Sequence, residues 1–186
     1  MTTRTALVLL QPVAVIAVVL VAFAFLNAPF RQAEATAAVE LLHLLGASPD
    51  RVQVRPESSV AVFTEGLGAF LAVVTPSCSS LASLLAVATL ALFTPRVGTP
   101  RLVGAIGAAV LCVVLGNVVR IAASIGIGLV SGTGSLVLFH DWVGSLFAFA
   151  YTLGGYLLML RILLPARRPA AAARPALPRP LEAARA

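Results

Sequence analysis

Residues 75–83 read Thr75-Pro-Ser-Cys-Ser-Ser-Leu-Ala-Ser83, and they stand where a partly polar, β-like segment gives way to a long apolar run. Proline lacks an amide donor and restricts the residue before it, so the Thr75-Pro76 step breaks regular structure at this boundary. Small hydroxylated residues surround Cys78, which leaves its thiol open to solvent or to a ligand. A lone cysteine is more often a small buried hydrophobe than a nucleophile, so its role depends on the residues that share its depth.

The composition around this stretch is that of an integral membrane protein. Of the 186 residues, 60% are hydrophobic and 11% are charged, and the mean hydropathy is +1.02; soluble domains are only roughly 45–50% apolar. The net charge is +6, and all 13 basic residues are arginines that lie in loops and chain ends, which indicates membrane topology rather than nucleic-acid binding. Cys78 and Cys112 form no CxxC pair, so the sequence predicts neither a metal site nor a cofactor, and Cys112 is expected to be structural.

Long apolar runs predict an all-α polytopic membrane protein with about four transmembrane helices. We expect these spans at about residues 6–26, 79–93, 102–119 and 142–164. The first run is longer than the core of a signal peptide, which favours a retained anchor. Residues 121–130 are too few for a further crossing, so an interfacial or re-entrant helix is expected there, ended by a flexible loop at 131–135.

Residues 27–77 form a segment of mixed polarity between the first two spans. A helix is expected over 34–45, ended by Gly46. Alternating apolar and polar residues over 51–55 and 60–63 predict short β-like strands. The segment has five acidic residues against three arginines, which makes it the least basic part of the chain.

The arginines predict the orientation in the membrane. With four crossings they fall on one side, and the positive-inside rule makes that side cytoplasmic; they are Arg4, Arg96, Arg101, Arg161 and those of the tail. Residues 1–5 are then a cytoplasmic N-terminus, 6–164 a single membrane catalytic domain, and 27–77 extracytoplasmic. Residues 165–186 consist mostly of alanine, proline and arginine, so a disordered basic cytoplasmic tail is expected.

Three chemically capable side chains reach the outer face in this topology. Cys78 begins the second span, Arg120 ends the third, and His140 precedes the fourth. Asn117 lies three residues before Arg120, on the same helical face. An arginine after a long apolar stretch is costly to bury and needs a partner or a task. The structural alternatives are that Arg120 extends to the lipid headgroups and that His140 belongs to an ordinary interfacial cluster.

Three motifs carry a resemblance to a known family. Thr75-Pro-Ser-Cys78-Ser-Ser-Leu81, Asn117-Val-Val-Arg120-Ile121 and His140-Asp-Trp-Val-Gly144 resemble the Cys, Arg and His motifs of the exosortase/archaeosortase family. The likeness covers roughly residues 34–160, in a short core form without extra spans. That family consists of membrane transpeptidase-like enzymes that process the C-terminal sorting signals of exported proteins. One departure is Ser80, which stands where the family usually has glycine.

The resemblance implies roles for these side chains. Cys78 is expected to be the nucleophile that forms a thioester, and His140 to carry the proton. Arg120 is expected to stabilise the thiolate or the oxyanion, with Asn117 as a second donor. The implied partners are membrane lipids and exported substrates that end in a short motif, one transmembrane helix and a basic cluster. Both hydrolysis and transfer to an acceptor amine remain open.

A non-enzymatic membrane scaffold or assembly protein is the main alternative, because it would have the same spans and tail. An intramembrane serine protease is disfavoured because no GxSx-type signature precedes a helix. A thiol oxidoreductase lacks its paired cysteines, and a transporter lacks charged groups within the spans and an evident repeat.

Overall fold

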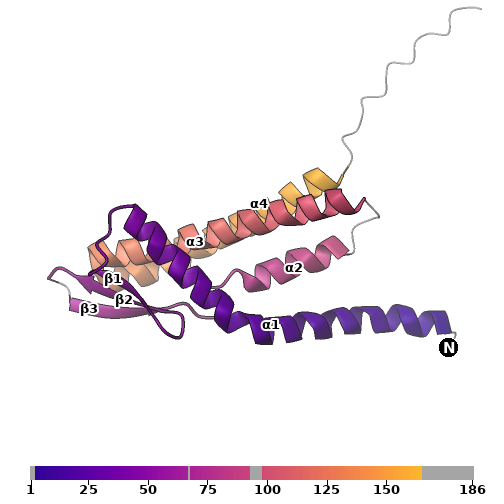
Figure 1. The fold of residues 1–186 in the computed structure, drawn as a ribbon, viewed down its shortest axis with the longest axis horizontal. Helices are drawn as coiled ribbons and strands as arrows, with labels where there is room; N and C mark the ends of the chain where they lie inside the picture. The colour runs from indigo at the N-terminus through magenta and orange to yellow at the C-terminus, as the bar shows by residue number, and fades with distance from the viewer. Residues whose placement is uncertain (1–2, 67, 93–97, 165–186) are drawn as a thin grey trace, which may run out of the picture.

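The computed structural model describes residues 3–66, 68–92 and 98–164. Five helical segments and a three-stranded sheet follow one another along the chain (Figure 1). In order they are α1 (Thr3–Leu44), β1 (Val52–Arg55), β2 (Ser59–Thr64), β3 (Gly68–Val73), α2 (Leu81–Leu92), α3 (Thr99–Leu138), the π-helical turn η1 (Phe139–Val143) and α4 (Gly144–Leu163). The expected tail at 165–186 lies outside the described residues.

Helix α1 is one continuous helix of 42 residues. The helix expected over 34–45 is present as the last part of α1 rather than as a separate helix, and its predicted end at Gly46 is confirmed by a φ of +98° there. Pro29 lies within α1, and a proline removes one helical hydrogen bond without ending a helix that packs on both sides of it. Figure 1 shows the helix changing direction along its length, so that its C-terminal part crosses the sheet.

The sheet is an antiparallel meander in the order β1-β2-β3. The strands predicted at 51–55 and 60–63 are confirmed, whereas the sequence pattern does not predict β3. Glu57 and Ser58 turn the chain between β1 and β2 with φ values of 62° and 59°. The buried valines of the sheet pack against α1 and α3, which fixes the sheet to one end of the helices.

Helix α3 extends well beyond the predicted third span. The expected separate helix at 121–130 is wrong, because α3 is helical from Thr99 through these residues. The break expected at 131–135 is present but shorter than predicted, because Gly132 alone is non-helical and the helix resumes after it. Gly132 has a φ of 82°, in the left-handed region that favours glycine. The chain reverses its direction at Gly132, since a Cβ at Gly128 would lie 2.8 Å from Leu136 and Arg120 contacts His140. The helical residues that follow, through η1 and α4, return beside the first part of α3.

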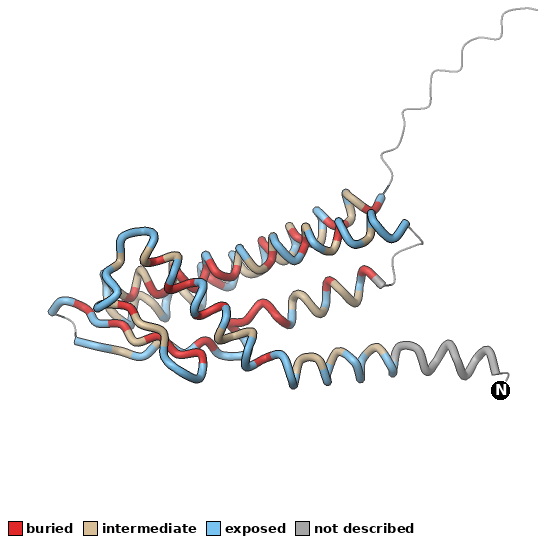
Figure 2. The backbone as a smooth tube through the Cα atoms, viewed as in Figure 1, coloured by how far each residue is buried: buried red, intermediate tan, exposed pale blue. Residues whose placement is uncertain are grey.

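Among the described residues, two segments are long and apolar enough to cross a membrane: Val13–Leu44 and Thr99–Leu163, the second of which contains both α3 and α4. Helix α2 has 12 residues and is about 18 Å long at ~1.5 Å per residue, short of the ~30 Å hydrocarbon core. The four predicted crossings therefore stay a prediction. Exposed residues follow the outer faces of the helices, and buried ones gather where α1, α2, α3 and the sheet meet (Figure 2).

Candidate active site

The predicted site residues meet where the sheet joins the helices. Cys78 lies in the turn between β3 and α2, Arg120 in α3 and His140 in η1. The Cys78 Sγ lies 3.1 Å from His140 Nε2, and Arg120 Nη2 lies 3.2 Å from the same ring nitrogen. Thr75 Oγ1 lies 3.0 Å from the sulfur on its other side. Three segments far apart in the sequence thus bring a thiol, an imidazole and a guanidinium into contact.

The guanidinium defines the tautomer of His140. Because arginine only donates hydrogen bonds, Nε2 must be the acceptor and Nδ1 must carry the proton. Nδ1 lies 3.0 Å from Asp141 Oδ1, which accepts that proton's hydrogen bond. The lone pair of Nε2 therefore faces both the thiol of Cys78 and the guanidinium of Arg120. An imidazole in this state is ready to accept a proton from the thiol.

Arg120 is held in a buried position that only a small neighbour permits. The residue is 5% exposed, and its Nε has no hydrogen-bond partner. A Cβ at Gly144 would lie 3.1 Å from that Nε, so a glycine at this position leaves room for the guanidinium. His140 lies just before Gly144, in a π-helical turn, a feature frequent at functional sites.

Asn117 holds the turn that carries the nucleophile candidate. Its side chain is fully buried, and its Nδ2 donates to Cys78 O at 3.0 Å and to Glu34 Oε1 at 2.7 Å. Arg120 Nη1 donates to the same Cys78 carbonyl at 3.4 Å. Tyr151 Oη donates to Asn117 Oδ1 at 2.9 Å. Both hydrogens of Nδ2 are therefore occupied by groups of the protein itself.

Glu34 of α1 is a site residue that sequence reasoning missed. Its carboxylate is buried at 3% exposure. Oε1 accepts from Asn117 Nδ2, from Ser80 Oγ at 2.6 Å and from Ser80 N at 3.1 Å. The sequence signal for Glu34 is its place within a long apolar helix, because an acidic side chain there is costly to bury without a partner. Ser80, at the usual glycine position, thus points its hydroxyl to Glu34 and is 1% exposed.

A cavity of about 310 Å³ opens beside the thiol. Residues 71–75 form one wall, Ile121, Ile125 and Leu136 form much of the other, and Cys78 and His140 lie at the same cavity. None of its lining residues is an aspartate, glutamate or arginine. The cavity therefore suits an uncharged, largely apolar ligand within reach of the sulfur.

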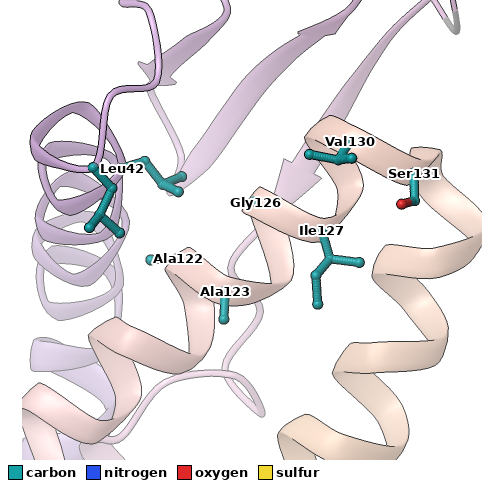
Figure 3. A pocket seen from close by; sticks show the side chains of 8 residues that line it. Leu42, Ala122, Ala123, Gly126, Ile127, Val130 and Ser131 are labelled. Carbon is teal, nitrogen blue, oxygen red and sulfur yellow. The ribbon is translucent and has the colours of Figure 1, made fainter.

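A second groove has a different character. It lies between the end of α1 and the middle of α3, with Leu42 on one side and Ala122, Gly126 and Val130 on the other (Figure 3). Its only polar lining side chain is Ser131, and none of the predicted site residues lines it. Within the part of the chain that the structure describes, no three histidine, cysteine or acidic side chains cluster as metal ligands.

Comparison with known proteins tests the resemblance in the three motifs. Neither the curated proteins nor the solved structures give a significant match. The family model described as a transmembrane exosortase (Exosortase_EpsH) matches residues 1–158, which is most of the 186-residue chain. That match includes all three motifs and takes in most of both segments long enough to cross a membrane. The chain therefore belongs to the transmembrane exosortase family.

Proposed function

We propose that this protein is a membrane cysteine transpeptidase or protease that cleaves C-terminal sorting signals of exported proteins through a thioester on Cys78. The observation that carries the proposal is the 3.1 Å distance between Cys78 Sγ and His140 Nε2, with Arg120 on the same ring nitrogen. A thiol beside an imidazole base is the arrangement that nucleophilic catalysis by cysteine needs.

The chemistry proceeds in two steps. The Cys78 proton moves to His140 Nε2, and the thiolate attacks the carbonyl carbon of the scissile peptide bond. A tetrahedral intermediate forms and then loses the amine, which takes the proton from the imidazolium, so a thioester to the upstream part of the substrate remains. Water or an acceptor amine then attacks the thioester, gives a proton to His140 and releases the Cys78 sulfur.

Arg120 changes partner during the first step. Once Nε2 is protonated it becomes a donor, and the guanidinium loses its acceptor on the ring. The freed Nη2 then has an anion nearby, either the thiolate or the oxyanion that follows from it. Donors aimed at developing negative charge in a site shielded from water are a large source of catalysis. Arg120 thus acts as the electrostatic stabiliser of this site.

Asn117 and Glu34 act as positioning residues in this scheme. Because Nδ2 of Asn117 already donates to Cys78 O and to Glu34 Oε1, it holds the turn of the nucleophile rather than the substrate. Glu34 in turn accepts from the amide and hydroxyl of Ser80. The Glu34 carboxylate thereby holds both Ser80, two residues after the nucleophile, and Asn117, one turn before Arg120.

The proposed substrates are exported proteins with a short motif, one C-terminal transmembrane helix and a basic cluster behind it. The positive-inside rule supports cytoplasmic N- and C-termini and an active site on the extracytoplasmic face. The motif then meets the segment 47–74, and the substrate's helix docks against the Gly- and Ala-rich third span from within the lipid.

Labelling of intact cells with a membrane-impermeant thiol reagent tests both the nucleophile and its side of the membrane. We expect Cys78 to be labelled from outside, and the labelling rate at neutral pH to fall in Arg120→Ala and His140→Ala variants. Cys112→Ser is the matched control, because Cys112 Sγ donates to the Tyr151 carbonyl, at 3.8 Å, and not to a histidine. Labelling of Cys78 that is indifferent to both partners would favour the scaffold alternative.

Processing of a substrate tests the reaction itself. The probe is an exported protein that ends in a short motif, an apolar helix and a basic tail. A Cys78→Ser variant should accumulate in the membrane and leave the substrate's C-terminal helix attached. Undiminished release by that variant would refute the thioester.

A further inference from the structure

The outer edge of the sheet is strand β3, which pairs with β2 alone (Figure 1). Val74 N donates to Ser58 O at 2.9 Å, and along an antiparallel strand the main-chain groups face the partner at every second residue. The amides and carbonyls of Val74 and Ala72 therefore face β2. Those of Val73 and Leu71 face the open edge, where a further strand would find two carbonyl acceptors and two amide donors, at residues 71 and 73.

This open edge lines the same cavity as the thiol. Leu71 and Val73 belong to its wall, together with Cys78 and His140. The two apolar side chains are 58% and 51% exposed. Proteins normally pair, cover or charge an exposed apolar edge strand, because such an edge is a template for pairing. The edge of β3 thus has free main-chain groups, uncovered apolar side chains and the reactive sulfur in one space.

We propose that β3 is the docking strand for the substrate. The stretch of the exported protein just before the scissile bond binds as a fourth strand along Leu71–Val73 and delivers its carbonyl to Cys78. The inference rests on the proposed function and specifies how that site recognises its substrate. Adding a strand to a sheet edge is a common way to bind extended peptides. The cavity wall of Ile121 and Ile125 favours small, uncharged side chains on one face of that peptide.

The direction of the bound strand follows from the course of the chain. Strand β3 leads through residues 74–77 to Cys78, and then to α2, which runs away from the sheet (Figure 1). A substrate whose motif precedes its membrane helix runs the same way, so it pairs in parallel with β3. In parallel pairing one substrate residue, opposite Ala72, donates its amide to Leu71 O and accepts from Val73 N.

Peptide electrophiles test this docking on the wild-type protein. The probes are the chloromethyl ketone of acetyl-Ala-Val-Ala-Val and that of acetyl-Val, applied to the purified full chain in detergent. We expect the longer probe to alkylate Cys78 about tenfold faster, as one or two additional hydrogen bonds would give. N-methylation of the main-chain amides of the longer probe, one at a time, should remove its rate advantage at every second position only. A uniform effect, or none, at all positions would overturn the proposal.

Two proline variants test the same edge from the protein side. Val73→Pro removes the outward-facing donor without touching the ladder to β2, and edge positions tolerate proline. We expect the ratio of the tetrapeptide rate to the iodoacetamide rate to fall about tenfold. Ala69→Pro is the matched control, because residue 69 has the same outward register but lies outside the cavity lining. Equal ratios in the two variants would contradict the docking.

The two proposals fail in different ways. Iodoacetamide alkylation of Cys78 that does not depend on His140 would refute the thiol–imidazole function, whatever the peptides do. Alkylation that depends on His140, but shows no alternation along the methylated peptide, would refute the docking strand alone.

Discussion

Arg120 Nη2 and His140 Nε2 lie 3.2 Å apart, although 20 residues separate them in the chain. The contact assigns the ring's proton to Nδ1 and presents the basic nitrogen to the thiol of Cys78. The guanidinium is buried with an unsatisfied Nε, so it has little freedom to move elsewhere. In the proposed mechanism, Arg120 thus prepares the base before reaction and gains an anion to stabilise once the proton has moved.

Replacing Arg120 by glutamine should slow thioester formation about 100-fold, the usual cost of losing a donor at a developing oxyanion. Single-turnover acylation by a substrate peptide, followed by mass spectrometry of the modified Cys78, measures this. Arg101→Gln is the control, because Arg101 bonds the carbonyls of Ile162 and Leu164 at the other end of α4. Equal rates in the two variants would contradict the role of Arg120.

The residues that meet at this site could be singled out from the sequence because they belong to short local motifs. Cys78 follows a Thr-Pro break, and Arg120 interrupts an apolar stretch where a charge needs a reason. When successive spans run in opposite directions, Cys78, Arg120 and His140 reach the same face of the membrane, where they can come into contact. The order of the residues along the chain is therefore enough to predict that these three side chains meet, as the structure has them, while their catalytic roles stay a prediction.

The supporting residues could not be identified in the same way. Glu34 and Asn117 are 83 residues apart, and only the packing of α1 on α3 brings them to 2.7 Å. The sequence-based prediction of where helices begin and end was limited for a related reason. The local signal at Pro29 predicts a break, but packing against neighbouring elements carries α1 through it, whereas the break predicted around Gly132 is present and is confined to that residue.

Removing the carboxylate of Asp141 should slow the acylation of Cys78 but leave the stability of the folded protein unchanged. Asp141→Ala deletes the acceptor that holds Nδ1–H of His140 at 3.0 Å, so the ring more often adopts the wrong tautomer or orientation. We expect acylation to slow about tenfold, as for other supporting groups of a general base. Because the side chain is 63% exposed, thermal unfolding in detergent should hardly change. A large loss of stability with an unchanged rate would contradict this assignment.

Glu34→Ala should destabilise the protein by about 3 kcal/mol, because buried donors would lose their acceptor. The donors are Asn117 Nδ2, Ser80 Oγ and Ser80 N. Ser80→Gly is the graded control, because it keeps the hydrogen bond from the amide of residue 80 to Glu34 and loses only the one from the hydroxyl, so we expect a loss of about 1 kcal/mol. Chemical unfolding in detergent compares the two, and equal losses would show that Glu34 does not organise this network.

Adjacent glycines of α4 should respond differently to the same substitution. A Cβ at Gly155 would lie 2.9 Å from Val113 Cγ2 and 3.2 Å from the Ala109 carbonyl, so Gly155→Ala forces α4 away from α3. We expect a loss of about 1–3 kcal/mol from this overpacking. At Gly154 a Cβ meets nothing within 4 Å, so Gly154→Ala should be neutral or stabilise the helix by up to about 1 kcal/mol. Thermal unfolding in one detergent compares the pair.

Because α3 carries Arg120 and α4 follows His140, Gly155→Ala should also slow alkylation of Cys78. Equal behaviour of the Gly154→Ala and Gly155→Ala variants would refute this close contact of the helices.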